Sequence, residues 1–251
     1  MNYWRTQLYG AQRKIEFPFI RSSNSRKTST DKAIRHSFSL NSCLLKAIEE
    51  LSINESVTKF IILLAVFDVL LHKLSGKEDL TVLSSFSGRS FTEIENLIGY
   101  FNNTLPIRLN LLKLETLTFR KLLEHIRKIV LEAYDHRVLP FGEMKNFFSS
   151  EPKNSCHKKA SLSVKFLYDN FLTRSVNLPE LKIDICQSDI EILTNSDLIL
   201  FITETKDWIH GQLIGRENLF DIKQMSTIAD DYCYLMEKLL VYPDQIIDNN
   251  F

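Results

Sequence analysis

The sequence lacks several features that mark large classes of protein. Its 251 residues include four cysteines, and no two of them form a Cys-x-x-Cys pair, which argues against a zinc site and against a disulfide framework. Lysine plus arginine and aspartate plus glutamate number 31 each, so the chain has no basic excess to attract phosphate backbones or anionic lipids. We therefore expect no metal site and no nucleic-acid partner.

Long apolar segments are also absent. The longest apolar run, from Phe60 to Leu71, is interrupted by Asp68 and is too short to cross a bilayer. The first residues, MNYWRTQLYG, contain neither the apolar core nor the cleavage site of a secretory signal. These observations predict a cytoplasmic chain that does not enter a membrane. With 44% hydrophobic residues, the chain can nevertheless bury a substantial core.

The periodicity of the apolar residues predicts strands that alternate with helices. Apolar stripes at helical spacing predict helices at about residues 44–51, 56–74, 118–136 and 221–240, and two capping boxes predict a short helix before Gly99. Alternating or continuous apolar runs predict strands at about residues 36–40, 80–86, 100–109, 161–168, 181–186, 197–205 and 208–215. This order of elements is typical of an α/β fold, in which a mixed sheet is covered by helices.

The first part of the chain differs in composition from the remainder. From Tyr3 to about Arg35 the sequence is largely polar, and the stretch from Ser22 to Thr30 contains almost nothing to bury. We interpret residues 1–35 as a linker segment and residues 36–251 as one globular lobe.

Several local motifs occur together in an order that is typical of one family. The most specific is Ile98-Gly99-Tyr100-Phe101-Asn102-Asn103-Thr104-Leu105 with Arg108, which is close to the signature I-G-x-F-x-N-T-x-x-x-R. Other fragments lie on both sides of it: Tyr3-Trp4, Gly10-Ala11, Leu70-Leu71-His72, Ser87-Gly88-Arg89, His136 with Leu139-Pro140-Phe141, Asp197-Leu198, Leu219-Phe220-Asp221 and Pro243-Asp244-Gln245. On these motifs the chain resembles the C-terminal half of a condensation domain from a nonribosomal peptide synthetase.

The resemblance implies a chloramphenicol-acetyltransferase-like fold, in which two similar lobes surround a tunnel. Residues 1–35 would then be the inter-lobe linker, and residues 36–251 the C-terminal lobe. In this family, carrier proteins present substrates on phosphopantetheine arms, and the amine of one substrate attacks the thioester of the other to form an amide. The implied partners are these carrier proteins, together with an N-terminal lobe or adjacent synthetase domains. No cofactor is expected to bind directly.

The family's catalytic histidine belongs to an HHxxxDG motif in the first lobe, and this sequence has no such motif. Its histidines are His36, His72, His125, His136, His157 and His210, and no two of them are adjacent. Histidine is the usual proton acceptor near neutral pH, so we assign no catalytic residue and expect the chain to be inactive alone. Two alternatives remain: a non-catalytic interaction module that binds a carrier protein or synthetase surface, and a standalone acyltransferase that uses one of these histidines.

Asn103 and Thr104 are the candidates for lining the tunnel that the resemblance implies. The amide of Asn103 could donate to and accept from a tethered substrate, although a polar pair at a strand end more often satisfies the local backbone. If Asn103 lines the tunnel, Asn103→Ala should cost about 1 kcal/mol of stability or less.

The remaining motif residues are expected to support the structure. Arg89 could form an ion pair with Asp197 or remain a solvated surface charge. His136 is expected to end a helix, where the helix dipole favours it, with Phe141 packed beneath it and Pro140 stopping the helix. Arg108 is the arginine that ends the I-G-x-F-x-N-T-x-x-x-R signature, and we expect it to have a structural role as well.

Overall fold

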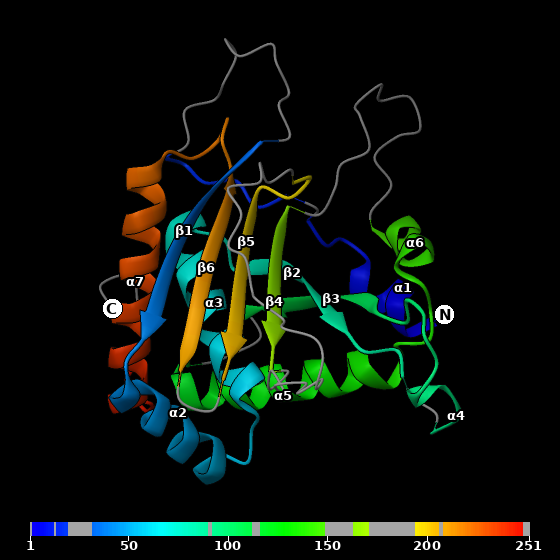
Figure 1. Ribbon diagram of the computed structural model, residues 1–251, viewed down its shortest axis with the longest axis horizontal. Coiled ribbons are helices and arrows are strands. Elements are labelled where there is room, and N and C mark those ends of the chain that lie inside the picture. Colours follow the sequence, from blue (N-terminus) through cyan, green and yellow to red (C-terminus); the bar gives the residue numbers. More distant parts are fainter. Residues whose placement is uncertain are drawn as a thin grey trace, which may run out of the picture.

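The computed structural model describes eight stretches of the chain: residues 2–12, 14–19, 32–89, 92–111, 116–148, 163–170, 194–205 and 208–247 (Figure 1). Its strands are β1 (Ala33–Leu40), β2 (Asp79–Phe86), β3 (Asn103–Asn110), β4 (Val164–Asp169), β5 (Leu198–Glu204) and β6 (Ile209–Arg216). Its helices are α1 (Asn2–Leu8), α2 (Ser42–Asn54), α3 (Lys59–Ser75), α4 (Thr92–Glu95), α5 (Phe119–Asp135), α6 (Phe141–Met144), the 3-10 turn η2 (Lys145–Phe147) and α7 (Ile222–Val241).

The strands form one mixed sheet in the order β1-β6-β5-β4-β2-β3. The inner strands β2, β4 and β5 are parallel, whereas β3, β6 and β1 are joined to their neighbours in antiparallel register. The carboxyl ends of β2, β4 and β5 therefore meet at one edge of the sheet. This arrangement confirms the expected α/β class, although the strand expected at residues 181–186 lies outside the described residues.

Helices α3, α5 and α7 pack against the sheet, with α3 between the other two (Figure 1). Helix α3 is buried on nearly every side, as its continuous apolar sequence predicts. Its N-cap is Thr58, two residues after the expected start of the helix, because the Thr58 hydroxyl accepts a hydrogen bond from the amide of Ile61. Gly76 ends the helix with a φ of 67°, which is a left-handed conformation that glycine adopts without strain.

The caps of the two other long helices agree with the sequence. Thr118 and Asp221 accept hydrogen bonds from backbone amides in the first turns of α5 and α7, and Asp221 forms a complete capping box with Gln224. None of the helices that the structure describes is long and apolar enough to span a membrane.

The N-terminal segment packs into the fold more closely than a linker would. Trp4 and Leu8 in α1 are almost completely buried, and Ile15 and Phe17 further along are buried as well. Strand β1 also begins at Ala33, earlier than expected. The segment is polar in overall composition, and this composition concealed Trp4 and Leu8. These two residues are four positions apart, so they lie on the same side of α1. The stretch from Ser22 to Thr30 lies outside the described residues.

One acidic side chain is buried within α3. Asp68 is 2% exposed, and its Oδ2 atom has no hydrogen-bond partner among the described residues. Burial raises the pKa of this carboxyl well above its ordinary value, so the folded chain retains a proton that the unfolded chain releases above about pH 4. Because the folded state binds more protons, this residue makes the chain less stable as the pH rises from about 4 towards the folded pKa.

We predict that Asp68→Asn gains stability relative to the parent chain as the pH rises from about 5 to about 8, because asparagine cannot ionise. Urea unfolding at several pH values measures the difference. Asp230→Asn, at an exposed position of α7, is the matched control, and its difference from the parent should change less with pH. An Asp68→Asn advantage that is constant across this range would contradict the prediction.

Candidate functional site

Asn103 begins β3, and its side chain is saturated with hydrogen bonds to the backbone. Its Nδ2 atom donates to the carbonyls of Arg137 at 2.7 Å and Leu139 at 2.8 Å. Its Oδ1 atom accepts from the amides of Thr104 at 2.9 Å and Phe141 at 3.2 Å. An asparagine side chain has two donors and an oxygen with two lone pairs, so all of this capacity is used. Asn103 thus clamps the turn after α5, and this local bonding favours the structural alternative over a contact with substrate.

The clamp explains why the motif around Pro140 accompanies the motif around Asn103. Pro140 precedes α6 in an extended conformation, and the next amide, of Phe141, donates to Asn103. The Phe141 ring lies 4.9 Å from the Nζ atom of Lys145. Thr104 is half-buried beside this clamp and pairs with Ser85 of β2. Its role in lining a tunnel stays a prediction.

His136 caps the C-terminus of α5, as expected. Its Nδ1 atom donates to the carbonyl of Glu132 at 2.8 Å, and its own carbonyl accepts from the Nε1 atom of Trp4 at 2.8 Å. The ring packed against it is that of Tyr3, whose centroid lies 4.1 Å away in a stacked arrangement. The sequence analysis expected Phe141 to pack against the His136 ring. The structure places Tyr3 of α1 there instead. Burial, reinforced by the charge of Glu132, raises the pKa of Tyr3 to about 12.

Arg108 joins the N-terminal segment to the sheet. Its Nε and Nη2 atoms donate to the two carboxylate oxygens of Asp79 at 2.8 and 2.6 Å. Its Nη1 atom donates to the carbonyls of Gln7 at 2.9 Å and Tyr9 at 2.7 Å. A bidentate pair of this kind is stronger and more specific in geometry than a single contact. Arg108 therefore has a structural role, and a sequence motif alone could not have identified the two carbonyls.

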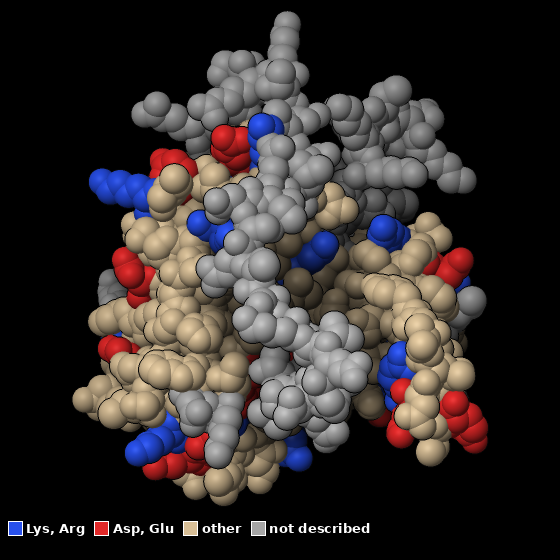
Figure 2. Space-filling model, viewed as in Figure 1, with Lys and Arg blue, Asp and Glu red and all other residues tan. Residues whose placement is uncertain are grey.

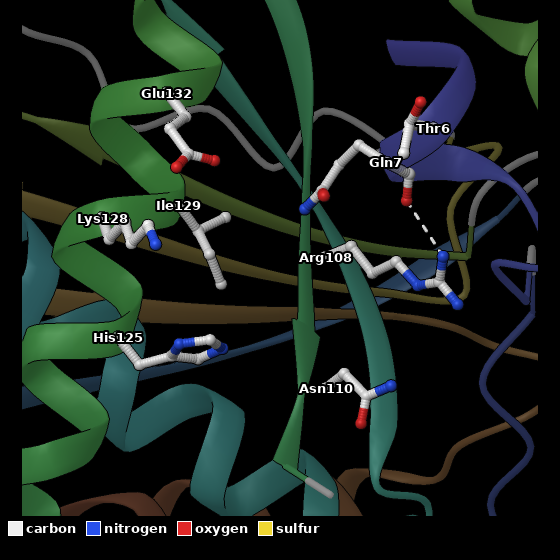
Figure 3. A pocket seen from close by; sticks show the side chains of 8 residues that line it. All are labelled: Thr6, Gln7, Arg108, Asn110, His125, Lys128, Ile129 and Glu132. Carbon is white, nitrogen blue, oxygen red and sulfur yellow. Dashed lines mark hydrogen bonds between the residues drawn. The ribbon is translucent and has the colours of Figure 1, made fainter. Parts of the chain in front are cut away.

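A polar pocket of about 380 Å³ adjoins Arg108, between α1, β3 and α5 (Figure 3). His125, Lys128 and Glu132 extend from α5 on one side, and Arg108 and Asn110 lie on the other. The pocket mixes donors with acceptors and acidic with basic groups. The described residues contain no cluster of three or more histidine, cysteine or acidic side chains that could hold a metal ion.

Arg89 and Asp197 do not form the ion pair that was one of the two alternatives for Arg89. Arg89 donates to the carbonyls of Ile94 and Glu95, and its guanidinium lies 4.4 Å from the centre of the Phe101 ring. Asp197 lies 3.7 Å from Arg216 instead. The pair does not form because Arg89 follows the carboxyl end of β2, whereas Asp197 precedes the amino end of β5. These strands run in the same direction, so the two residues lie at opposite edges of the sheet.

Two polar arrangements were missed by the sequence interpretation. Glu204, at the end of β5, accepts hydrogen bonds from Lys59 at 2.6 Å and from the Tyr168 hydroxyl. On the exposed face of the sheet, the Ser39 Oγ and His210 Nδ1 atoms are 2.9 Å apart in paired strands. The partners in each case are far apart in the chain, so no local motif identifies them.

Charged residues of both signs are visible on one face of the described part of the chain (Figure 2). On the face shown in Figure 2, acidic and basic side chains alternate around the periphery of the described part of the chain. This distribution agrees with the equal numbers of acidic and basic residues in the sequence.

The family model described as "Condensation domain" matches residues 1–250. One of the linear gramicidin synthase proteins of Brevibacillus parabrevis is 32% identical over 97% of this chain, which covers 5% of that protein. Malpinin synthetase of Mortierella alpina is 30% identical over 87% of this chain, which covers 3% of that protein. The chain therefore corresponds to a small part of each of these synthetases.

Solved structures with the same fold are about twice as long. The condensation domain from the monacolin K polyketide synthase matches with a TM-score of 0.84 and 18% identity, over 98% of this chain and 58% of that one. The X-domain from teicoplanin biosynthesis matches with a TM-score of 0.83 and 20% identity, over 98% and 55%. A complex of that X-domain with OxyB matches with a TM-score of 0.81 and 20% identity, over 98% and 53%.

The hydrogen bonds of Asn103 revise the stability effect expected for its substitution. We predict that Asn103→Ala lowers the free energy of unfolding by about 2–3 kcal/mol, because four net hydrogen bonds of about 0.5–1.5 kcal/mol are lost from a partly buried site. Asn102→Ala, at the exposed neighbouring position, should change stability by less than about 0.5 kcal/mol. Urea unfolding compares the two variants, and equal losses would contradict the role of Asn103 as a clamp.

Proposed function

The chain belongs to the condensation-domain family, and from that premise we propose that its 251 residues supply the C-terminal lobe for amide-bond formation between substrates tethered to carrier proteins. The observation that carries this proposal is the extent of the structural match. Nearly all of the chain, 98%, superposes on only 58% of a solved condensation domain. The fold is the chloramphenicol-acetyltransferase-like fold of these neighbours, and we assign residues 36–251 to the lobe and residues 1–35 to the segment that leads into it.

The proposed reaction requires a proton acceptor, which we assign to a lobe other than the one that this chain forms. An amine attacks the thioester carbonyl, the carbon–sulfur bond breaks, the thiol leaves, and the nitrogen loses a proton. Within the described residues, His72 donates to the carbonyl of Lys77, His136 donates to that of Glu132, and His210 contacts Ser39. None of these has an arrangement of nucleophile, base and orienting group. The base is therefore assigned to a lobe that carries the HHxxxDG motif.

The substrates are proposed to arrive on the phosphopantetheine arms of carrier proteins, which act as tethers and not as a resident cofactor. The synthetases that resemble this chain support such partners, together with adjacent synthetase domains. The lobe would provide one wall of the reaction space, and its sheet and clamps would keep that wall rigid.

We predict that the purified chain alone forms no amide product from carrier-bound substrates. Adding a first lobe that contains HHxxxDG, taken from a homologous condensation domain, should restore product, which mass spectrometry of the loaded carrier protein detects. The same first lobe with the second histidine of its motif changed to alanine is the control and should restore none. Turnover by the chain alone would contradict the proposal, and His72→Ala and His136→Ala would then locate the base.

An exposed apolar arm is the proposed contact for the first lobe. The arm comprises α4 and residues 96–102, and it lies at the periphery of the molecule (Figure 1). Ile98 is 105% exposed and Tyr100 is 87% exposed, whereas Arg89 holds the backbone of the arm through its carbonyls. Neighbouring exposed apolar side chains of this kind usually mark a surface that another protein covers.

We predict that Ile98→Ser and Tyr100→Ser each weaken binding of the first lobe by at least about tenfold, because each removes apolar surface from the contact. Ile53→Ser removes an exposed isoleucine from α2 and should leave binding unchanged. Calorimetry or analytical ultracentrifugation measures the affinity. If Ile53→Ser and Ile98→Ser weaken binding of the first lobe equally, the arm is not part of the interface.

A second candidate function is a non-catalytic interaction module. The X-domain from teicoplanin biosynthesis has the same fold and was solved in complex with OxyB, so a protein of this shape can be bound by another protein. The reconstitution described above separates the two candidates. Binding of a carrier protein or synthetase domain without restored amide formation favours the module.

A further inference from the structure

An apolar pocket lies where the parallel strands end. Its cavity volume is about 640 Å³, and it is bounded by the carboxyl ends of β2, β4 and β5, the start of α3 and the C-terminal half of α5. In open α/β sheets, ligands bind preferentially outside the carboxyl ends of the strands. The volume also lies within the range of small-molecule sites, about 300–1,000 Å³. Location and size thus both indicate a ligand site.

Aromatic rings form the wall of this pocket. The ring of Phe60 lies 5.6 Å from that of Phe86 and 6.1 Å from that of Tyr168, measured between centroids. Phe86 continues the row to Tyr134, 6.3 Å away. Val130 and Leu131 of α5 complete the apolar lining. Such a wall favours an apolar group that can pack against ring faces and edges.

Both charged residues that line the pocket already have partners. Lys59 forms an ion pair with Glu204 at 2.6 Å and a second one, at 2.8 Å, with Glu49, which is not part of the lining. Burial, followed by the hydrogen bond to Glu204, raises the pKa of Tyr168, which therefore stays neutral at physiological pH. A charged ligand group would lose its hydration here without gaining a partner, and that is costly. The pocket is therefore complementary to an uncharged group.

The mouth of the pocket is polar but uncharged. Ser85, Ser87 and Asn170 lie there, and their hydroxyl and amide groups can form hydrogen bonds with a peptide unit. Ser85 also pairs with Thr104, which places the pocket beside the signature motif. An apolar side chain carried on an amide backbone satisfies both parts of this lining.

We propose that this pocket receives the aromatic or branched aliphatic side chain of an aminoacyl group tethered to a carrier protein. The proposal rests on the proposed function, since that function supplies the class of substrate. It adds a preference for large uncharged side chains, and it assigns that preference to Phe60, Phe86, Tyr134 and Tyr168.

The test is a titration of the full chain with stable pantetheine analogues, in which an amide replaces the thioester. We expect the phenylalanyl analogue to bind at least about tenfold more tightly than the alanyl analogue, because it buries an additional phenyl ring, and even one methylene in a hydrophobic pocket is worth about tenfold or more. The aspartyl analogue should bind no better than the alanyl one. Isothermal titration calorimetry measures all three.

Two substitutions fill the pocket from its mouth. Ser85→Trp and Ser87→Trp should each lower the affinity for the phenylalanyl analogue by at least about tenfold, and should lower the affinity for the alanyl analogue by a smaller factor, because both analogues share the peptide unit but only the phenylalanyl ring needs the space. Ser37→Trp makes the same change at an exposed position of β1 and should alter neither affinity. Circular dichroism identifies any variant that does not fold, and the other tryptophan variant then decides the question.

Equal affinity for the phenylalanyl and alanyl analogues would overturn the proposal, as would phenylalanyl binding that both tryptophan variants leave unchanged. Loss of phenylalanyl binding when a first lobe is added would show that this lobe fills the pocket, and would also overturn it. If the reunited lobes form amides without a side-chain preference, the proposed role of the pocket is refuted and the proposed function is retained. If the chain binds the phenylalanyl analogue selectively but amide formation is not restored, the proposed function is refuted and the role of the pocket is retained.

Discussion

Burial of α3 is the constraint on which the rest of this structure depends. The helix is apolar around most of its circumference, so it is stable only when other elements surround it. It contacts β2 of the sheet, and α2, α5 and α7 pack around it. The same helix begins at the carboxyl ends of the parallel strands, where Lys59 and Phe60 enter the apolar pocket. The packing that stabilises the lobe therefore also positions its candidate ligand site.

The signature residues of the family serve mainly as clamps between backbone segments. Asn103 holds the turn after α5, Arg108 holds the segment after α1, and Arg89 holds the arm. In each case one polar side chain satisfies two or more carbonyl groups that lie at the ends of short helices or in the turns that follow helices. Such groups would otherwise have to find water, which is costly where they are partly buried. A motif of this kind specifies a shape, and it does not by itself identify a catalytic group.

A structural role for these motif residues agrees with the proposed function. A lobe that contributes a rigid wall needs clamps and a covered sheet, whereas proton transfer needs a base, which the proposal assigns to the other lobe. The apolar pocket would give the wall a chemical role of its own, because recognition of a side chain requires only packing and the exclusion of charge. Selectivity could then reside in one lobe while the chemistry resides in the other.

The sequence alone determined the local elements and the family. Apolar periodicity depends on residues only a few positions apart, which is why helices at about residues 56–74, 118–136 and 221–240 were predicted close to the observed bounds of α3, α5 and α7. Only the tertiary structure decided which side chains meet. Strand order separated Arg89 from Asp197 and brought Lys59 to Glu204 across 145 positions. Three of the four hydrogen bonds of Asn103 go to a turn more than 30 residues away. Such partners depend on how distant strands and helices pack, and short-range sequence patterns do not encode that packing.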